Sequence, residues 1–165
     1  MASTFSSDLK LELMATGENA GTWGTKTNNN LNLVQQSVAG YQAIDVASSD
    51  VVLAMSDATI SNGRNATLKF TGTLAANRTV TLPDSIEKVF NVVDGTDHAG
   101  YTLTFKTASG TGVLLCEGNC YLVYSDGTNI VSANEYRKWR TVSAAETIQA
   151  GAKLFVATNG GAVTI

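Results

Sequence analysis

The stretch Thr67-Leu68-Lys69-Phe70-Thr71 alternates polar and apolar side chains, and this period of two decides the fold class. The same alternation recurs in residues 79–82 (Thr-Val-Thr-Leu) and 101–106 (Tyr-Thr-Leu-Thr-Phe-Lys). Successive side chains of a strand point to opposite faces, so each stretch predicts a strand with one buried face and one threonine-lined face. Short strands separated by turn residues favour a multi-stranded antiparallel sandwich or prism-like β domain.

Apolar segments run into Asp-Gly or Asn-Gly pairs at three places, which are Asp94-Gly95, Asp126-Gly127 and Asn159-Gly160. Such pairs are a strong signal for a tight hairpin turn between two strands. Their spacings of 32 and 33 residues fit a repeated hairpin unit in an elongated β assembly. The same pairs also fit turns that are simply common between strands.

The first fifty residues follow another pattern. Residues 16–25 are rich in glycine around Trp23 and predict a loop that is anchored by that aromatic ring. Residues that cap helices well follow from Thr27 to Asn30. We therefore expect one short helix of about three turns after this loop, ending at Gly40.

That helix carries an apolar stripe at i, i+3, i+7 and i+10, formed by Leu31, Val34, Val38 and Tyr41. A lone apolar stripe must be buried against something. It is either the core of a small module or a face that meets other copies or a partner. Because only about fifty residues precede the β region, we expect Trp23 and the stripe to form a subunit or partner contact.

The composition excludes several functional classes. The chain has 165 residues, a net charge of −3 and only 15% charged residues, so a sequence-independent grip on nucleic acid is not expected. No apolar run approaches the roughly 20 residues of a membrane span, and residues 1–10 do not resemble a signal peptide. We therefore expect assembly in a cytosol-like compartment, and the weak charge repulsion favours an oligomer.

Candidate chemical groups are few. His98 is the only histidine and lies in a predicted exposed turn with Asp94 and Asp97, whose spacing does not make an EF-hand. Cys116 and Cys120 either bridge across a turn or remain free thiols, and a reducing compartment favours free thiols. We expect no catalytic residue, no metal site and no cofactor, and hence no enzyme.

One basic cluster, residues 137–140 (Arg-Lys-Trp-Arg), follows Tyr136. A cation beside an aromatic ring can bind a glycan, a phosphate or another subunit. The cluster is either a solvated connector or a subunit contact formed by Tyr136, Arg137 and Trp139.

Several segments together resemble the N-terminal part of tail-fibre and related structural proteins of marine tailed bacteriophages. They are residues 17–30, 40–47, 65–74, 77–84, 101–112 and 124–131, and the resemblance covers most of the chain up to about Ala133. It implies a virion location, a β-rich architecture intertwined in a homotrimer, and an N-terminal region attached to tail or adaptor proteins. It offers no catalytic residues to carry over.

These observations predict three parts: a virion-anchoring segment with one helix (1–50), a β domain (51–135), and a connector leading into a further β element (136–165). The expected function is that of a phage virion component assembled in the bacterial cytoplasm. A tail fibre attached to the tail, adaptor or baseplate and projecting toward the host fits best. A receptor- or glycan-binding module and a head fibre or decoration protein remain alternatives. Partners are copies of the chain, tail proteins and a host receptor, with no nucleic acid and no membrane insertion.

Overall fold

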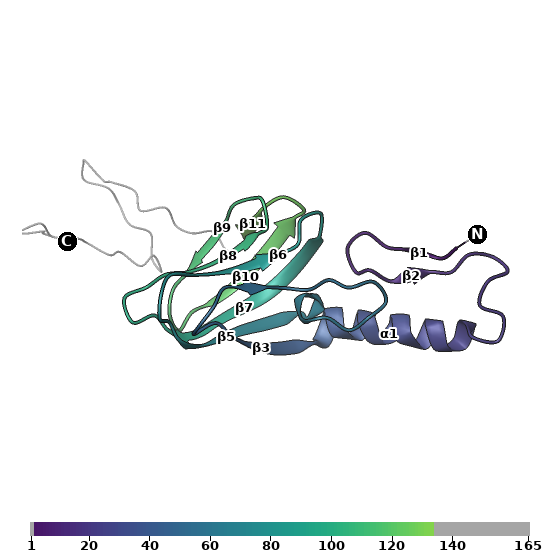
Figure 1. Cartoon of the computed structure of the whole chain (residues 1–165), viewed down its shortest axis with the longest axis horizontal. Coiled ribbons are helices and arrows are strands. Elements are labelled where there is room, and N and C mark those ends of the chain that lie inside the picture. The colour runs from purple at the N-terminus through teal and green to yellow at the C-terminus, as the bar shows by residue number, and fades with distance from the viewer. Residues whose placement is uncertain (1, 134–165) are drawn as a thin grey trace, which may run out of the picture.

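A computed structural model describes residues 2–133, of which 40% lie in strands and 15% in helices. The mainly β prediction is therefore confirmed. The molecule is elongated, with α1 and a small hairpin at one end and two sheets at the other (Figure 1). Within the described residues, no helix has the length and apolarity required to cross a lipid bilayer.

The N-terminal end contains a hairpin and one long helix: β1 (Thr4–Phe5), β2 (Glu12–Leu13) and α1 (Trp23–Ala39). The β region follows as β3 (Tyr41–Asp45), β4 (Val51–Val52), a 3-10 turn η1 (Asn62–Arg64), β5 (Thr67–Thr73), β6 (Arg78–Leu82), β7 (Glu87–Asp97), β8 (Leu103–Thr107), β9 (Gly112–Leu115), β10 (Cys120–Asp126) and β11 (Ile130–Ser132).

The chain winds alternately between two sheets. The five-stranded sheet has the order β11-β10-β7-β5-β3, and the four-stranded sheet has the order β4-β6-β8-β9. Strands β3, β5 and β7 are parallel in the first sheet, as are β4, β6 and β8 in the second. Between two successive parallel strands of one sheet, the chain passes through a strand of the other sheet. The crossover connection therefore needs no helix.

The prediction of an antiparallel domain is wrong for the pairs that these six strands form with one another. Within residues 2–133, antiparallel pairing is confined to β1–β2 and to the pairs β8–β9, β7–β10 and β10–β11 at the end of the β region. The reason is physical: a period of two shows which side chains face the core, but it carries no information about the direction of the neighbouring strand.

The strand positions themselves are confirmed. Leu68 and Phe70 in β5, Val80 and Leu82 in β6, and Leu103 and Phe105 in β8 are buried. The residues that alternate with them along each strand are not fully buried and lie on the other face. Tyr101 precedes β8 rather than belonging to it.

Three phenylalanines join the two sheets in the core. Phe105 of the four-stranded sheet contacts Phe70 and Phe90 of the five-stranded sheet in edge-to-face geometry, at ring-centroid distances of 5.9 and 5.7 Å. Such pairs stabilise a core beyond the area that they bury. This core lies between the sheets and does not include the helix.

The predicted hairpin turns have different outcomes. Asp126-Gly127 does form the turn between β10 and β11, with Asp126 accepting hydrogen bonds from the amides of Thr128 and Asn129 at 2.8 and 2.6 Å. Asp94-Gly95 lies inside β7, so the turn prediction there is wrong. Asn159-Gly160 lies outside the described residues.

The helix starts earlier than expected. It begins at Trp23 and has 17 residues, so Asn28, Asn29 and Asn30 lie inside it rather than at its start. Gly40 ends the helix as predicted, and β3 begins at the next residue and pairs with β5. A side chain at Gly40 would collide with the carbonyl oxygen of Gln36 and the side chain of Asn65.

Arg64 connects the two ends of the molecule. Its guanidinium is fully buried and donates hydrogen bonds to the carbonyl oxygens of Leu9, Ser56 and Thr59 and to the hydroxyl of Ser61. Burial lowers the pKa of Arg64, and the charge of Asp57 opposes that shift. The N-terminal hairpin and the loop between β4 and η1 are thereby held together by one side chain.

We expect Arg64→Met to lower the free energy of unfolding by about 3 kcal/mol, because several buried carbonyl oxygens lose their donor. Chemical denaturation measures this change. Arg78→Met is the control, since the Arg78 side chain hydrogen-bonds only the carbonyl oxygen of Ala47 among the described residues. Equal losses for the two variants would contradict the central role of Arg64.

Lys88 makes the stability of the fold depend on pH. Its ammonium lies 4.1 Å from the centre of the Phe90 ring, and burial lowers its pKa from 10.5 to about 8. Between these two values the unfolded chain holds a proton that the folded chain releases, so Lys88 makes stability rise with pH across this window.

Lys88→Met removes this dependence. At pH 7 the free energy of unfolding of the variant should exceed that of the parent by the largest amount. The difference should shrink by pH 10, as measured by denaturation at both pH values. Lys69→Met, on the outer face of the neighbouring strand, is the control. A pH-independent difference for Lys88→Met would refute the assignment.

Candidate assembly surface

The polar face of α1 is held inside the molecule. The side-chain amide of Asn30 binds the backbone of Glu12 twice, accepting from its N–H at 3.0 Å and donating to its carbonyl oxygen at 2.8 Å. The Glu12 carboxylate, which is buried, forms an ion pair with Lys26 at 2.8 Å. The helix thus completes the edge of the β1–β2 hairpin as a neighbouring strand would.

The same face also binds the loop between β4 and η1. Asn29 donates to the carbonyl oxygen of Ala58 at 2.7 Å, and Gln36 donates to that of Ser61 at 3.0 Å. Leu33 is the one fully buried side chain of the helix. The inward face of α1 is therefore made mostly of amide side chains, each fixed by the backbone of another segment.

The opposite face of α1 carries Leu31, Val34 and Val38 of the predicted stripe and is exposed, and Tyr41 follows at the start of β3. Leu31 is 61% exposed, Val38 is 74% exposed, and Val34 and Tyr41 are exposed as well. Figure 1 shows the hairpin along one side of α1 and no described element along the other. We call Leu31, Val34, Val38 and Tyr41 the helix stripe. The helix is inverted relative to an ordinary surface helix, whose apolar face is buried.

The helix stripe has the 3-4 spacing of a coiled-coil seam. Within α1, Leu31 and Val38 occupy one heptad position and Val34 occupies the other. The prediction that Tyr41 continues the stripe on the helix is wrong, because the helix ends before Gly40 and Tyr41 begins β3. Lys26 is the only charged residue of the helix, and it is bound on the other face. Two such stripes could meet without like-charge repulsion.

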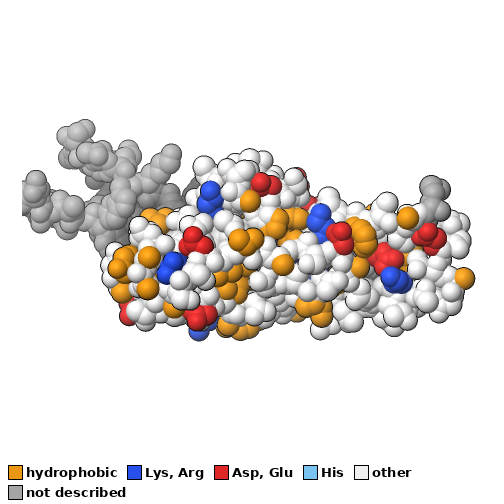
Figure 2. Space-filling view, in the orientation of Figure 1, with side chains coloured by type: hydrophobic (Ala, Val, Ile, Leu, Met, Phe, Trp, Pro, Cys, Tyr) orange, Lys and Arg blue, Asp and Glu red, His pale blue; other side chains and the backbone are white. Residues whose placement is uncertain are grey.

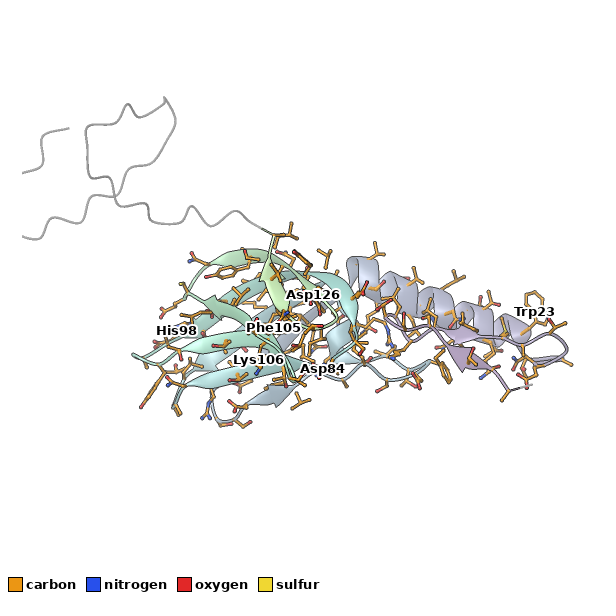
Figure 3. The ribbon with its side chains drawn as sticks, turned by 90° about the horizontal axis from the view of Figure 1, so that it is seen from above. Trp23, Asp84, His98, Phe105, Lys106 and Asp126 are labelled. Atoms are coloured by element: carbon orange, nitrogen blue, oxygen red, sulfur yellow. The ribbon has the colours of Figure 1, made fainter. Side chains whose placement is uncertain are left out.

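Trp23 lies apart from the helix stripe. It is 63% exposed at the first residue of α1, at the tip farthest from the sheets (Figure 3). The loop before it turns tightly through left-handed residues, including Gly17 and Gly21. Phe5, Leu13 and Met14 are also exposed in this N-terminal part. The tip is therefore a second apolar surface.

A hydrogen-bonded pair that the sequence analysis missed lies at the opposite end of the molecule. Asp94 is fully buried in β7 and its carboxylate lies 2.8 Å from Nε2 of His98, which is half-buried rather than in an exposed turn. Thr96 donates to the same carboxylate from its N–H and its hydroxyl at 3.1 and 2.6 Å. The pair fixes the orientation of the imidazole. In the sequence, only the spacing of four residues between Asp94 and His98 could have indicated this pair.

Cys116 and Cys120 are free and exposed, and no group of three potential metal ligands occurs within residues 2–133. Tyr121 is buried and its hydroxyl accepts a hydrogen bond from the Cys116 N–H, so its ring is no platform for a sugar. A hollow of about 280 Å³ lies beside the end of α1, lined mainly by Asn32, Gln35, Gln36 and Ile60.

The predicted contact residues Tyr136, Arg137 and Trp139 lie outside the described residues. The other predicted ones, Trp23 and the helix stripe, are exposed on α1 and at the start of β3. No family model matches the chain, and neither the curated proteins nor the solved structures contain a match.

The inverted helix predicts a specific effect of Asn30→Ala. Glu12 should lose both backbone hydrogen bonds to α1, so its amide proton should exchange about tenfold faster or more, which corresponds to about 1.4 kcal/mol of local opening. Hydrogen exchange measures this change. Asn32→Ala, an exposed neighbour on α1, is the control and should leave the Glu12 amide protected.

Proposed function

We propose that the protein is a structural component of a bacteriophage virion, namely the anchoring part of a tail fibre that assembles as a homotrimer. It attaches through its N-terminal end to a tail, adaptor or baseplate protein and projects toward the host. It acts by assembly rather than by catalysis. The resemblance of residues 17–131 to phage tail-fibre proteins supplies the virion context for this proposal.

The inverted helix is the observation that carries the proposal. The amide side chains of α1 are used within the chain, whereas its apolar side chains face outward. The helix stripe alone exposes roughly 400 Å² of surface per copy, about half of the 800 Å² that each partner contributes to a standard interface. The stripe can therefore supply the apolar centre of a subunit interface.

The residue types of the stripe favour three copies over two. Valine and threonine, at Val34 and Thr27, occupy the heptad position where parallel dimers prefer leucine. Leu31 and Val38 occupy the position where dimers prefer a β-branched residue, which Val38 provides and Leu31 does not, so the preference for three copies rests on Val34 and Thr27. Parallel copies would bring identical layers together along the axis, and the uncharged flanks of α1 would not oppose this arrangement.

The exposed tip supports an N-terminal attachment. Trp23 lies about 12 Å along the helix axis from Leu31, given a rise of 1.5 Å per residue, so it remains available when the stripe is covered. Large aromatic side chains are typical anchors of protein interfaces. The sheets lie at the other end of the molecule and would project away from the attachment point.

Native mass spectrometry of the full chain tests the assembly. The parent protein should be a trimer, and Val38→Lys should be monomeric because three ammonium groups would meet at the axis. Val38 is exposed within the chain, so the far-ultraviolet circular dichroism of the monomer should be unchanged. Asn32→Lys, which adds the same charge off the stripe, is the control and should remain trimeric.

Labelled antibody against the chain, applied to intact phage particles, tests the virion location. Binding at the tail supports the proposal, binding at the head indicates a head fibre or decoration protein, and no binding refutes a virion role. A parent chain that stays monomeric at high concentration would refute the assembly function.

A further inference from the structure

The outer face of the five-stranded sheet carries a second exposed apolar area. Val89 in β7 is 59% exposed, and Leu122 and Tyr124 in β10 are 45% and 39% exposed. Val89 lies directly opposite Tyr124 in the antiparallel register, and Val131 of β11 lies opposite Tyr124 on its other side. We call Val89, Leu122 and Tyr124 the sheet patch.

Two carboxylates border the sheet patch. Glu87 and Asp126 are direct cross-strand partners, two residues beyond Val89 and Tyr124 on the same face. Backbone amides of Asn129 and Thr128 lower the pKa of Asp126 and favour its charged form. Figure 3 shows Asp126 on the side of the β domain that faces α1.

Like charges placed directly opposite each other destabilise a sheet. Within residues 2–133, no lysine or arginine forms an ion pair with Glu87 or Asp126. The sheet patch and its acidic border therefore fit a partner that combines an aromatic or aliphatic group with cations.

The chain itself contains such a segment close by. The N–H of Ala133 donates to the carbonyl oxygen of Leu122 at 2.8 Å, so the described chain ends at the sheet patch. Tyr136-Arg137-Lys138-Trp139-Arg140 follows within seven residues, which span up to about 23 Å when extended. The distance along β10 from Leu122 to Asp126 is about 13 Å, so the segment can reach the whole patch.

The charges of the two parts are complementary. Of 11 basic and 14 acidic residues in the chain, residues 134–165 contain four basic and two acidic ones, which leaves 7 basic and 12 acidic residues in the rest. The basic residues of the segment are concentrated around Trp139, and the described part has the opposite charge.

We propose that residues 136–140 bind the sheet patch of their own chain. Trp139 packs against Val89, Leu122 and Tyr124, and the flanking cations of the segment pair with Glu87 and Asp126. The segment thereby covers the sheet patch on β7 and β10. This inference does not depend on the virion role or on the helix stripe.

Zero-length carbodiimide crosslinking of the full chain tests the proposal. The expected product joins the Lys138 amine to Glu87 or Asp126 and is identified by mass spectrometry. Mixing isotopically light and heavy chains before crosslinking distinguishes a segment of the same chain from one of a neighbouring copy. Crosslinked products within one isotope support the proposal, and mixed products, which indicate a neighbouring copy, overturn it.

Fluorescence of Trp139 in a Trp23→Phe background provides an independent readout. Val89→Lys should shift the emission of Trp139 to longer wavelength and abolish the crosslink. Leu114→Lys, at an equally exposed apolar position of the other sheet, is the matched control and should do neither. Circular dichroism verifies that both variants fold. Emission that does not respond to Val89→Lys, together with no crosslink in the parent chain, overturns the proposal.

Discussion

The buried guanidinium of Arg64 is the constraint on which the arrangement of the molecule depends. An arginine cannot give up its charge inside a protein, so its donors must all find acceptors. It finds them in the backbone of Leu9, 55 residues earlier, and in the loop that precedes η1. The hairpin and this loop are thereby held together on one side of α1, at the edge of the two sheets.

The orientation of α1 follows from that arrangement. The hairpin and loop present backbone N–H and carbonyl groups to the helix, and these groups must be satisfied when they are covered. Amide side chains such as Asn29, Asn30 and Gln36 satisfy them, whereas valine or leucine could not. The apolar side chains are left to face outward. Figure 2 shows that charged side chains are scattered over the visible face of the molecule, among many uncharged ones.

The sequence reveals local structure well and pairing poorly. The alternation around Phe70 correctly predicts a strand and its buried face, and the spacing of Leu31, Val34 and Val38 correctly predicts a helix that stops at Gly40, whereas Tyr41 lies in β3. The parallel winding between two sheets is missed, because the same alternation serves both strand directions. Asp94-Gly95 predicts a turn and instead lies in the middle of β7, where pairing to β5 and β10 keeps the backbone extended.

The amino-acid sequence by itself therefore determines which side chains share a face, since that depends only on the repeat of a strand or a helix. It also determines the low charge of the surface and the basic character of residues 137–140. Only the tertiary structure decides which face of α1 is covered, which direction each strand runs, and that His98 meets a buried carboxylate. These outcomes depend on contacts between segments far apart in the chain, such as Arg64 with Leu9, and no local pattern specifies them.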